Sequence, residues 1–291
     1  MILLDGKKVR DQRVPELRRE IRELGFAPVL GIVQIGRLER SEAYVIQKIR
    51  FGELIGARIE QVRLSADVST EDVLFEIRRL NADPAVNGVI IQLPLPQGID
   101  RRVVIEAIDP TKDVDGLTAR NLKSLLENDH QGFLPATTKG VLSLLRHYEV
   151  PIEGREVVVV GRSLLVGKST ALAFLNENAT VTICHRFTRD LPEVTKRGDI
   201  LVVATGSPLL ITPEHVHKGQ VVVDVGINVS NKESLAEEIS APKLIGDVDF
   251  VRVKDQVLAI SPVPGGVGPM TVLSLFENLI EAARRHGASA R

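Results

Sequence analysis

The stretch VVVVGRSLLVGKST, residues 157–170, decides the fold class of this 291-residue chain. Four consecutive valines predict a strand buried on both faces, because a half-exposed strand would alternate polar and apolar side chains. A turn from Gly161 to Gly167 follows, and a helical segment begins after it. Together they present backbone N–H groups and a helix N-terminus to a phosphate. The stretch indicates a dinucleotide-binding unit. Its spacing is not GxGxxG, so an ordinary strand-to-helix turn is the alternative.

Short apolar runs alternate with amphipathic segments along the rest of the chain. The predicted strands are residues 30–33, 88–91, 157–160, 180–183, 201–203 and 221–223. The predicted helices are residues 9–24, 39–55, 70–81, 168–177 and 270–285. Short, fully apolar strands separated by helices are typical of parallel sheets covered on both faces. We therefore expect an α/β protein, and its 291 residues favour two domains.

Proline and glycine mark the expected domain limits. They punctuate residues 150–154, just before the valine strand, and they are frequent again in residues 262–269. The amphipathic helix at 270–285 must pack on another surface, and it could return to the first domain. We expect one domain to comprise residues 140–261 and the other to comprise residues 1–139 with 262–291.

Charge and composition exclude several classes of protein. The chain has 37 Lys and Arg against 38 Asp and Glu, so it lacks the basic surface of a general nucleic-acid binder. Aromatic residues make up 3%, too few for base-stacking platforms. Cys184 is the single cysteine and can form no intrachain disulfide. No apolar run approaches the ~18 residues of a membrane span. We expect a soluble, cytoplasmic protein that binds neither nucleic acid nor membrane.

The end of the second predicted strand of the nucleotide fold favours NADP over NAD. An NAD site commonly has Asp or Glu about 20 residues beyond the glycine turn, where it binds the ribose hydroxyls. Here that region reads Cys184-His185-Arg186, and Arg162 and Arg189 lie nearby in the sequence. Guanidinium groups bind a 2′-phosphate well. For each arginine alone, a solvated surface charge is the alternative.

Lys48 lies in a partly apolar stripe of the predicted helix 39–55. Tyr44, Phe51 and Ile55 share its face at 100° per residue. Burial lowers the pKa of a lysine, which can then act as an acid or a base near neutral pH. The alternative is a lysine whose stem packs while its ammonium reaches solvent.

Three further segments could border a ligand. Gln92 follows the apolar strand 88–91, and open parallel sheets bind ligands beyond the carboxyl ends of their strands. Residues 113–116 carry two carboxylates, although they also fit a plain turn. Residues 264–268 form a glycine cluster that permits close backbone approach to a flat ligand, or a hinge. The six histidines show no metal-ligand spacing, so we expect no metal site.

Together these segments resemble one family, the bifunctional methylenetetrahydrofolate dehydrogenase/cyclohydrolases. The resemblance covers nearly the whole chain and rests on residues 44–48, 88–96, 112–116, 222–228 and 261–271, in that order. It implies that NADP takes a hydride from 5,10-methylenetetrahydrofolate, and that the 5,10-methenyl product is hydrolysed to 10-formyltetrahydrofolate. It also implies a homodimer and a role in the one-carbon metabolism that serves purine biosynthesis. The alternatives are a dehydrogenase with weak or lost cyclohydrolase activity and a catalytically silent folate- or nucleotide-binding paralogue.

The same resemblance implies the architecture and the roles of individual residues. Residues 1–139 with 262–291 would form a folate-binding catalytic domain, residues 140–261 a Rossmann-like NADP-binding domain, and the folate cleft would lie between them. Lys48 would be the catalytic lysine, Gln92 would orient it, and Asp115 would bind the pterin. The folate site would comprise Tyr44, Lys48, Ile91, Gln92, Leu93, Asp115, Pro264, Gly265, Gly266, Val267 and Gly268. The dinucleotide site would comprise Gly161, Arg162, Ser163, Arg186 and Ile227.

Several residues depart from the family pattern. Residues 36–41 read GRLERS where an Asp-Pro-Ala-Ser-like turn is usual. Ala136 and Thr138 replace the usual Cys and Pro, and Leu164 and Ser169 replace the common Asn and Pro. The last two lie at the glycine turn, so we expect them to bear on cofactor binding.

Overall fold

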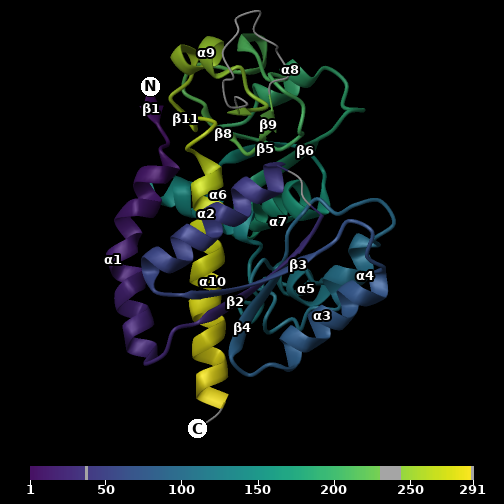
Figure 1. Cartoon of the computed structure of the whole chain (residues 1–291). Helices are drawn as coiled ribbons and strands as arrows, with labels where there is room; N and C mark the ends of the chain where they lie inside the picture. The colour runs from purple at the N-terminus through teal and green to yellow at the C-terminus, as the bar shows by residue number, and fades with distance from the viewer. Residues whose placement is uncertain (37–38, 230–243, 290–291) are drawn as a thin grey trace, which may run out of the picture. The chain divides into compact units, whose positions relative to one another are not determined.

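The computed structural model describes residues 1–36, 39–229 and 244–289 (Figure 1). Residues 37 and 38 of the variant turn at 36–41 lie outside the described residues. The chain forms two compact α/β units, and the prediction of an α/β fold is confirmed. Unit 1 comprises residues 1–10 and 137–271, and unit 2 comprises residues 11–136 and 272–291. One unit limit falls inside α1 (Gly6–Leu24) and another inside α10 (Val267–Ser289), so both helices contribute to both units.

Unit 1 is built on a six-stranded parallel sheet with the strand order β1-β11-β8-β7-β5-β6. Its strands are β1 (Ile2–Leu3), β5 (Glu156–Val160), β6 (Thr180–Cys184), β7 (Ile200–Val203), β8 (Val221–Asp224) and β11 (Ala259–Ile260). The chain leaves β5 for β6 on one side and returns to β7 on the other. The strand order therefore reverses between β5 and β7, and ligands bind open α/β sheets beyond the carboxyl ends of the strands at such a point.

Helices and one short hairpin complete unit 1. They are α6 (Ala136–His147), the π-helical turn η1 (Leu164–Lys168), α7 (Ser169–Asn176), α8 (Leu191–Thr195), η2 (Pro213–His215), α9 (Phe250–Val253) and η3 (Lys254–Gln256), with the antiparallel pair β9 (Asn228–Val229) and β10 (Leu244–Ile245). The valines of β5 are almost completely buried, as the unbroken apolar run predicts.

Unit 2 contains a three-stranded parallel sheet with the order β3-β2-β4. Its strands are β2 (Val29–Ile35), β3 (Arg58–Leu64) and β4 (Val86–Ile91), and its further helices are α2 (Glu39–Ile55), α3 (Thr70–Ala82), α4 (Arg101–Glu106) and α5 (Ala119–Leu126). Helix α3 covers one face, where Leu80 packs on Gly31. Helix α10 covers the other face, where Leu279 packs on Gly88. The sheet is thus buried on both sides.

Three segments fall outside the domain limits expected from the sequence, namely residues 1–10, 137–139 and 262–271. Residues 1–10 belong to unit 1 because β1 pairs in parallel with β11. Residues 262–271 also belong to unit 1, where the N–H of Lys7 donates a hydrogen bond of 2.9 Å to the carbonyl oxygen of Gly265. Strands of two residues, such as β1 and β11, are too short to show a periodic pattern.

Candidate active site

Lys48 and Gln92, which the sequence analysis assigned to one site, come together in unit 2. Lys48 lies on α2, and Gln92 follows β4 directly. The Nζ of Lys48 donates a hydrogen bond of 2.8 Å to Oε1 of Gln92. The Nε2 of Gln92 donates one of 2.8 Å to the carbonyl oxygen of Leu93. Because this second bond holds the amide nitrogen, the amide oxygen faces the lysine.

The apolar stripe of α2 fixes the position of Lys48. Phe51 and Ile55 are buried, and the ring of Phe51 meets that of Phe276 on α10 at a centroid distance of 5.5 Å. Tyr44 precedes Lys48 by one helical turn and is half-buried. The lysine stem therefore rises from a packed helix face. Its ammonium group is bonded to Gln92 rather than extended into solvent, which argues against the snorkelling alternative.

Lys48 and Asp115 interact electrostatically in a buried environment. Burial lowers the pKa of Lys48, and the charge of Asp115 opposes that effect in part. Burial also raises the pKa of Asp115 to about 6, although Lys48 favours its ionised form, and Asp113 adds to the increase. A lysine and a carboxyl whose pKa values move towards neutrality are typical of sites that transfer protons or bind charged ligands.

The segment that carries Asp115 is anchored on α3. The ammonium group of Lys112 is buried and donates to three carbonyl oxygens at the C-terminal end of that helix, those of Leu80, Asn81 and Asp83. A cation there satisfies carbonyl groups that have no partner within the helix. Lys112 thereby fixes the backbone three residues before Asp115.

Asp113 has a structural role in the same segment. Its Oδ2 accepts hydrogen bonds from the N–H of Thr118 at 2.7 Å and from Nδ2 of Asn121 at 2.8 Å. The side chain is completely buried. The sequence left open whether residues 113–116 form a turn or border a ligand. Asp113 holds the turn, whereas Asp115 is the carboxylate coupled to Lys48.

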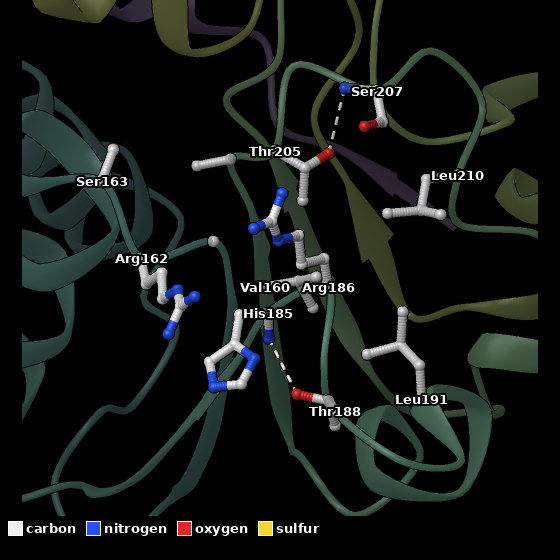
Figure 2. Close-up of a pocket in the computed structure, with 12 residues that line it drawn as sticks. Val160, Arg162, Ser163, His185, Arg186, Thr188, Leu191, Thr205, Ser207 and Leu210 are labelled. Atoms are coloured by element: carbon white, nitrogen blue, oxygen red, sulfur yellow. Dashed lines mark hydrogen bonds between the residues drawn. The ribbon is translucent and has the colours of Figure 1, made fainter.

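A cavity of about 640 Å³ lies in unit 1 at the carboxyl ends of β5, β6 and β7 (Figure 2). This is the point at which the strand order reverses, and the volume suits a small-molecule ligand. Four of the predicted cofactor residues line it, namely Gly161, Arg162, Ser163 and Arg186. The fifth, Ile227, lies in the same unit between β8 and β9 and is not among the lining residues.

Close backbone packing explains the unusual glycine spacing of the turn after β5. Gly161 has a φ of 134°, and a Cβ there would lie 2.2 Å from the carbonyl oxygen of Ala204. A Cβ on Gly167 would lie 2.3 Å from the carbonyl oxygen of Gly161. Ser163 begins the π-helical turn by accepting hydrogen bonds from the N–H groups of Val166 and Gly167. Both glycines are therefore needed to bring this turn to the cavity.

Two residues that depart from the family pattern contact each other next to this turn. The hydroxyl groups of Thr138 on α6 and Ser169 on α7 are 3.0 Å apart, and both side chains are buried. Ser169 also donates to the carbonyl oxygens of Leu165 and Val166 in the π-helical turn. The two departures are thus one interaction, which ties the turn to α6.

A buried carboxylate that the sequence analysis missed, Asp247, supports another part of the cavity wall. The Oδ2 of Asp247 accepts hydrogen bonds from the N–H of Thr205 at 2.6 Å and of Gly206 at 2.9 Å. Its Oδ1 accepts one of 2.8 Å from Nδ2 of Asn228. Thr205 lines the cavity, so Asp247 fixes part of its wall from behind.

Asp224 and two glycines complete this arrangement. Asp224 accepts hydrogen bonds from the N–H groups of Gly226, Asp247 and Val248, and burial raises its pKa to about 7. A Cβ on Gly226 would lie 2.1 Å from the carboxyl carbon of Asp247, and a Cβ on Gly246 would lie 1.9 Å from Oδ2 of Asp224. In the sequence, Gly226 and Gly246 are the detectable signal that the backbone approaches these two carboxylates closely.

The predicted folate residues belong to two units. Residues 44, 48, 91–93 and 115 belong to unit 2, and the glycine cluster 264–268 belongs to unit 1. In unit 1 this cluster packs on the first turn of α1, where a Cβ on Gly6 would lie 2.0 Å from the carbonyl oxygen of Gly266.

The part of the chain that the structure describes holds neither a cluster of metal ligands nor a helix that could span a membrane. Residues 1–36, 39–229 and 244–289 contain no group of three His, Cys, Asp or Glu placed to hold a metal ion. In the same ranges, no helix combines the length and the apolar character needed to cross a membrane.

Models of two protein domains match almost the whole chain. The model of the tetrahydrofolate dehydrogenase/cyclohydrolase catalytic domain matches residues 4–115, and that of the NAD(P)-binding domain of the same proteins matches residues 135–287. The chain belongs to the tetrahydrofolate dehydrogenase/cyclohydrolase family. The resemblance inferred from the sequence is confirmed, and so is an NAD(P)-binding domain.

Individual members of the tetrahydrofolate dehydrogenase/cyclohydrolase family match over almost their full length. The bifunctional protein FolD of Methanoculleus marisnigri is 45% identical over 283 residues, which cover 97% of this chain and 96% of the relative. The bifunctional protein FolD of Lactobacillus helveticus is 44% identical over 287 residues, covering 97% and 98%.

Solved structures of the family confirm the fold. The bifunctional FolD enzyme of Campylobacter jejuni superposes with a TM-score of 0.92 at 37% identity, covering 98% of this chain and 99% of that one. The Trypanosoma brucei FolD, solved with NADP cofactor and an inhibitor, gives 0.93 at 34% identity and covers 100% and 99%. The predicted architecture of a catalytic and a dinucleotide-binding α/β domain is thereby confirmed.

Proposed function

We propose that this chain oxidises 5,10-methylenetetrahydrofolate with NADP and hydrolyses the 5,10-methenyl product to 10-formyltetrahydrofolate. The observation that carries the proposal is the contact between Lys48, whose pKa burial lowers, and the oriented amide of Gln92. Relatives that are called bifunctional FolD and are 45% and 44% identical over 97% of this chain support both activities.

The cavity in unit 1 fits a dinucleotide with a 2′-phosphate. Gly161 and Gly167 bring the turn after β5 close to the ligand space, and Arg162 and Arg186 add positive charge. The acid that would bind the ribose hydroxyls of NAD is replaced by the sequence His185-Arg186 after β6. When bound, NADP supplies the hydride acceptor. Gly161, Arg162, Ser163 and Arg186 hold it, and we also assign Ile227 to its surroundings.

In the oxidation step, the main contribution of the protein is to align the folate with the dinucleotide. No proton transfer is needed in the bond that reacts, so positioning of the two reactants provides the rate. Asp115 accepts hydrogen bonds from the N–H donors of the pterin and thereby orients the ring. Tyr44, Ile91, Leu93 and the backbone of residues 264–268 border the folate.

The hydrolysis step requires two proton transfers by Lys48, and a further proton is released to solvent. The oxygen of a water molecule attacks the methenyl carbon, and the neutral amine of Lys48 takes a proton from that water. The protonated Lys48 then donates to the departing ring nitrogen N5 as the bond between this carbon and N5 breaks. The hydroxyl proton of the adduct leaves to solvent, and the formyl group stays on N10. Gln92 keeps the Nζ of Lys48 in place during both transfers.

The wider assignments are part of the same proposal. Unit 2, which is matched by the catalytic-domain model, carries the folate chemistry, and unit 1 carries the dinucleotide. We assign the chain to the cytoplasm, to a homodimer, and to the supply of one-carbon units for purine biosynthesis. Light scattering after size exclusion tests the dimer.

A spectroscopic assay tests the function. Purified protein receives methylenetetrahydrofolate with NADP or NAD, and the formation and the decay of the methenyl compound are followed separately. We expect NADP-dependent formation followed by enzymatic decay. Formation without enzymatic decay would favour the monofunctional dehydrogenase, and the absence of both would favour the silent paralogue.

A further inference from the structure

We propose that Phe187 is a positioning residue for NADP: its ring holds the guanidinium groups of Arg162 and Arg186 together as one receptor for the 2′-phosphate. The inference rests on the proposed NADP-dependent oxidation, and it adds a residue that determines which dinucleotide is used.

The two arginines converge on one aromatic ring from different segments. Arg162 follows β5, and its Cζ lies 5.7 Å from the ring centroid of Phe187. Arg186 follows β6, and its Cζ lies 4.6 Å from the same centroid. Both distances are within the range of cation–π attraction. One ring therefore gathers two charges that would otherwise repel each other.

Phe187 supports the cavity without lining it. Arg162 and Arg186 are lining residues, and Figure 2 draws both at the cavity together with His185. Phe187 is not among the lining residues, although it follows Arg186 directly in the chain. Phe187 is 65% exposed, so its ring contributes little to the packing of the core. The contacts of the exposed ring are instead with Arg162 and Arg186, whose guanidinium groups it attracts.

The arginines keep their charge available for a ligand. In the described ranges 1–36, 39–229 and 244–289, no carboxylate lies within 4.0 Å of the guanidinium nitrogens of Arg162 or Arg186. Long flexible side chains lose entropy when they bind, and a ring that holds them beforehand reduces this loss. A phosphate monoester, with its negative charge and several acceptor oxygens, is the group that this pair suits.

The turn that carries Phe187 is itself fixed. The N–H of His185 donates to Oγ1 of Thr188 at 2.8 Å, as Figure 2 shows, and the N–H of Phe187 donates to Nδ1 of His185 at 3.2 Å. The rings of His185 and Phe187 meet edge to face with centroids 6.1 Å apart. The aromatic ring thus has a defined place, which a positioning role requires.

The test compares Phe187→Leu and Phe187→Tyr with the unmodified protein. Leucine keeps apolar bulk and removes the π face, whereas tyrosine keeps the π face. Phe75, which is 63% exposed on α3 of unit 2, provides the matched control Phe75→Leu. The measurements are KM and kcat with NADP and with NAD, and the rate of methenyl hydrolysis without dinucleotide. Competitive inhibition by adenosine 2′,5′-bisphosphate and by 5′-AMP separates the 2′-phosphate from the rest of the ligand.

We expect Phe187→Leu to raise KM for NADP by about threefold to tenfold, the range given by one or two exposed cation–π contacts. Its kcat, its KM for NAD and its hydrolysis rate should stay within twofold. Inhibition by adenosine 2′,5′-bisphosphate should weaken in parallel, and inhibition by 5′-AMP should not. Phe187→Tyr should restore selectivity, and Phe75→Leu should change nothing.

Two results would overturn the inference: an equal change for both dinucleotides, or no change for either. Its failure is distinguishable from failure of the proposed function. If the unmodified protein oxidised no folate, calorimetric binding of adenosine 2′,5′-bisphosphate to wild type and Phe187→Leu would still decide the role of the ring.

Discussion

The amide of Gln92 is oriented by Leu93 so that its oxygen accepts the hydrogen bond from Nζ of Lys48 at 2.8 Å. This hydrogen bond favours one position of the Lys48 ammonium group, while burial lowers its pKa. Burial favours the neutral form of this amine, and the neutral form is the one that can take a proton from the attacking water.

Replacing Lys48 by Met should separate the two activities. Methionine keeps an apolar stem, so packing damage should be small, while the proton carrier is lost. We expect methenyl hydrolysis to fall by about 10²–10⁴-fold, the typical contribution of positioned proton transfer. Some oxidation should survive, so the methenyl compound should accumulate in the coupled assay. Lys123→Met on the exposed face of α5 is the control. Hydrolysis near the wild-type rate would restore the snorkelling interpretation of Lys48.

Folate use should weaken as the pH falls through about 6. Burial raises the pKa of Asp115 to about 6, so its carboxyl gains a proton in this range and loses an acceptor for the pterin. The profile of kcat/KM reports on groups of the free enzyme, and it should decline on the acid side for both reactions. In Asp115→Asn this decline should vanish and folate affinity should be low at every pH. A wild-type profile that is flat between pH 5 and 7 would contradict the assignment.

Arg162→Ala should weaken NADP binding far more than NAD binding. The expected loss is about 1.5–3 kcal/mol, the range for hydrogen bonds to charged groups. Titration calorimetry with each dinucleotide measures it. Equal losses for both would mean that Arg162 does not bind the 2′-phosphate.

Asp247→Asn should destabilise unit 1 and loosen the cofactor cavity. One carboxylate oxygen becomes an amide nitrogen, which cannot accept from the N–H groups of Thr205 and Gly206 or from Asn228. We expect a loss of about 1.5–3 kcal/mol in urea denaturation, together with weaker NADP binding. The exposed Asp255→Asn should change stability by no more than about 0.5 kcal/mol. Unchanged denaturation of Asp247→Asn would show that this carboxylate does not hold the wall.

A double-mutant cycle should reveal coupling between Thr138 and Ser169. Their hydroxyl groups are 3.0 Å apart in a buried site, and each has a further partner, Thr170 for Thr138 and the carbonyl oxygens of Leu165 and Val166 for Ser169, so Thr138→Val and Ser169→Ala each remove one hydrogen bond of a small network. We expect a coupling energy of about 0.5–1.5 kcal/mol in the free energy of unfolding. Additive effects of the two substitutions would show that the contact contributes nothing.

Much of the fold could be predicted because buried parallel strands leave unbroken apolar runs, as in β4 and β5. Strand β3, Arg58–Leu64, was missed because it is only half-buried and has no apolar run, and because the consecutive polar residues Glu60 and Gln61 interrupt its alternating pattern. The contact between Lys48 and Gln92 agrees with helix periodicity and with a strand-end position, two signals visible in the sequence. The carboxylates of Asp224 and Asp247 could not be predicted, because sequence periodicity does not indicate which acids are buried.

The pairing of β1 with β11 has a consequence for biosynthesis. The strand Ile2–Leu3 leaves the ribosome long before its partner Ala259–Ile260, which lies far along the sequence. The core of unit 2 also cannot be completed before α10 is synthesised. Phe276, Asn278 and Leu279 on that helix pack against residues that are made much earlier. Neither unit can close vectorially, so the nascent chain exposes apolar surface for most of its synthesis. Such a chain depends on chaperones during synthesis more than one whose domains fold in sequence.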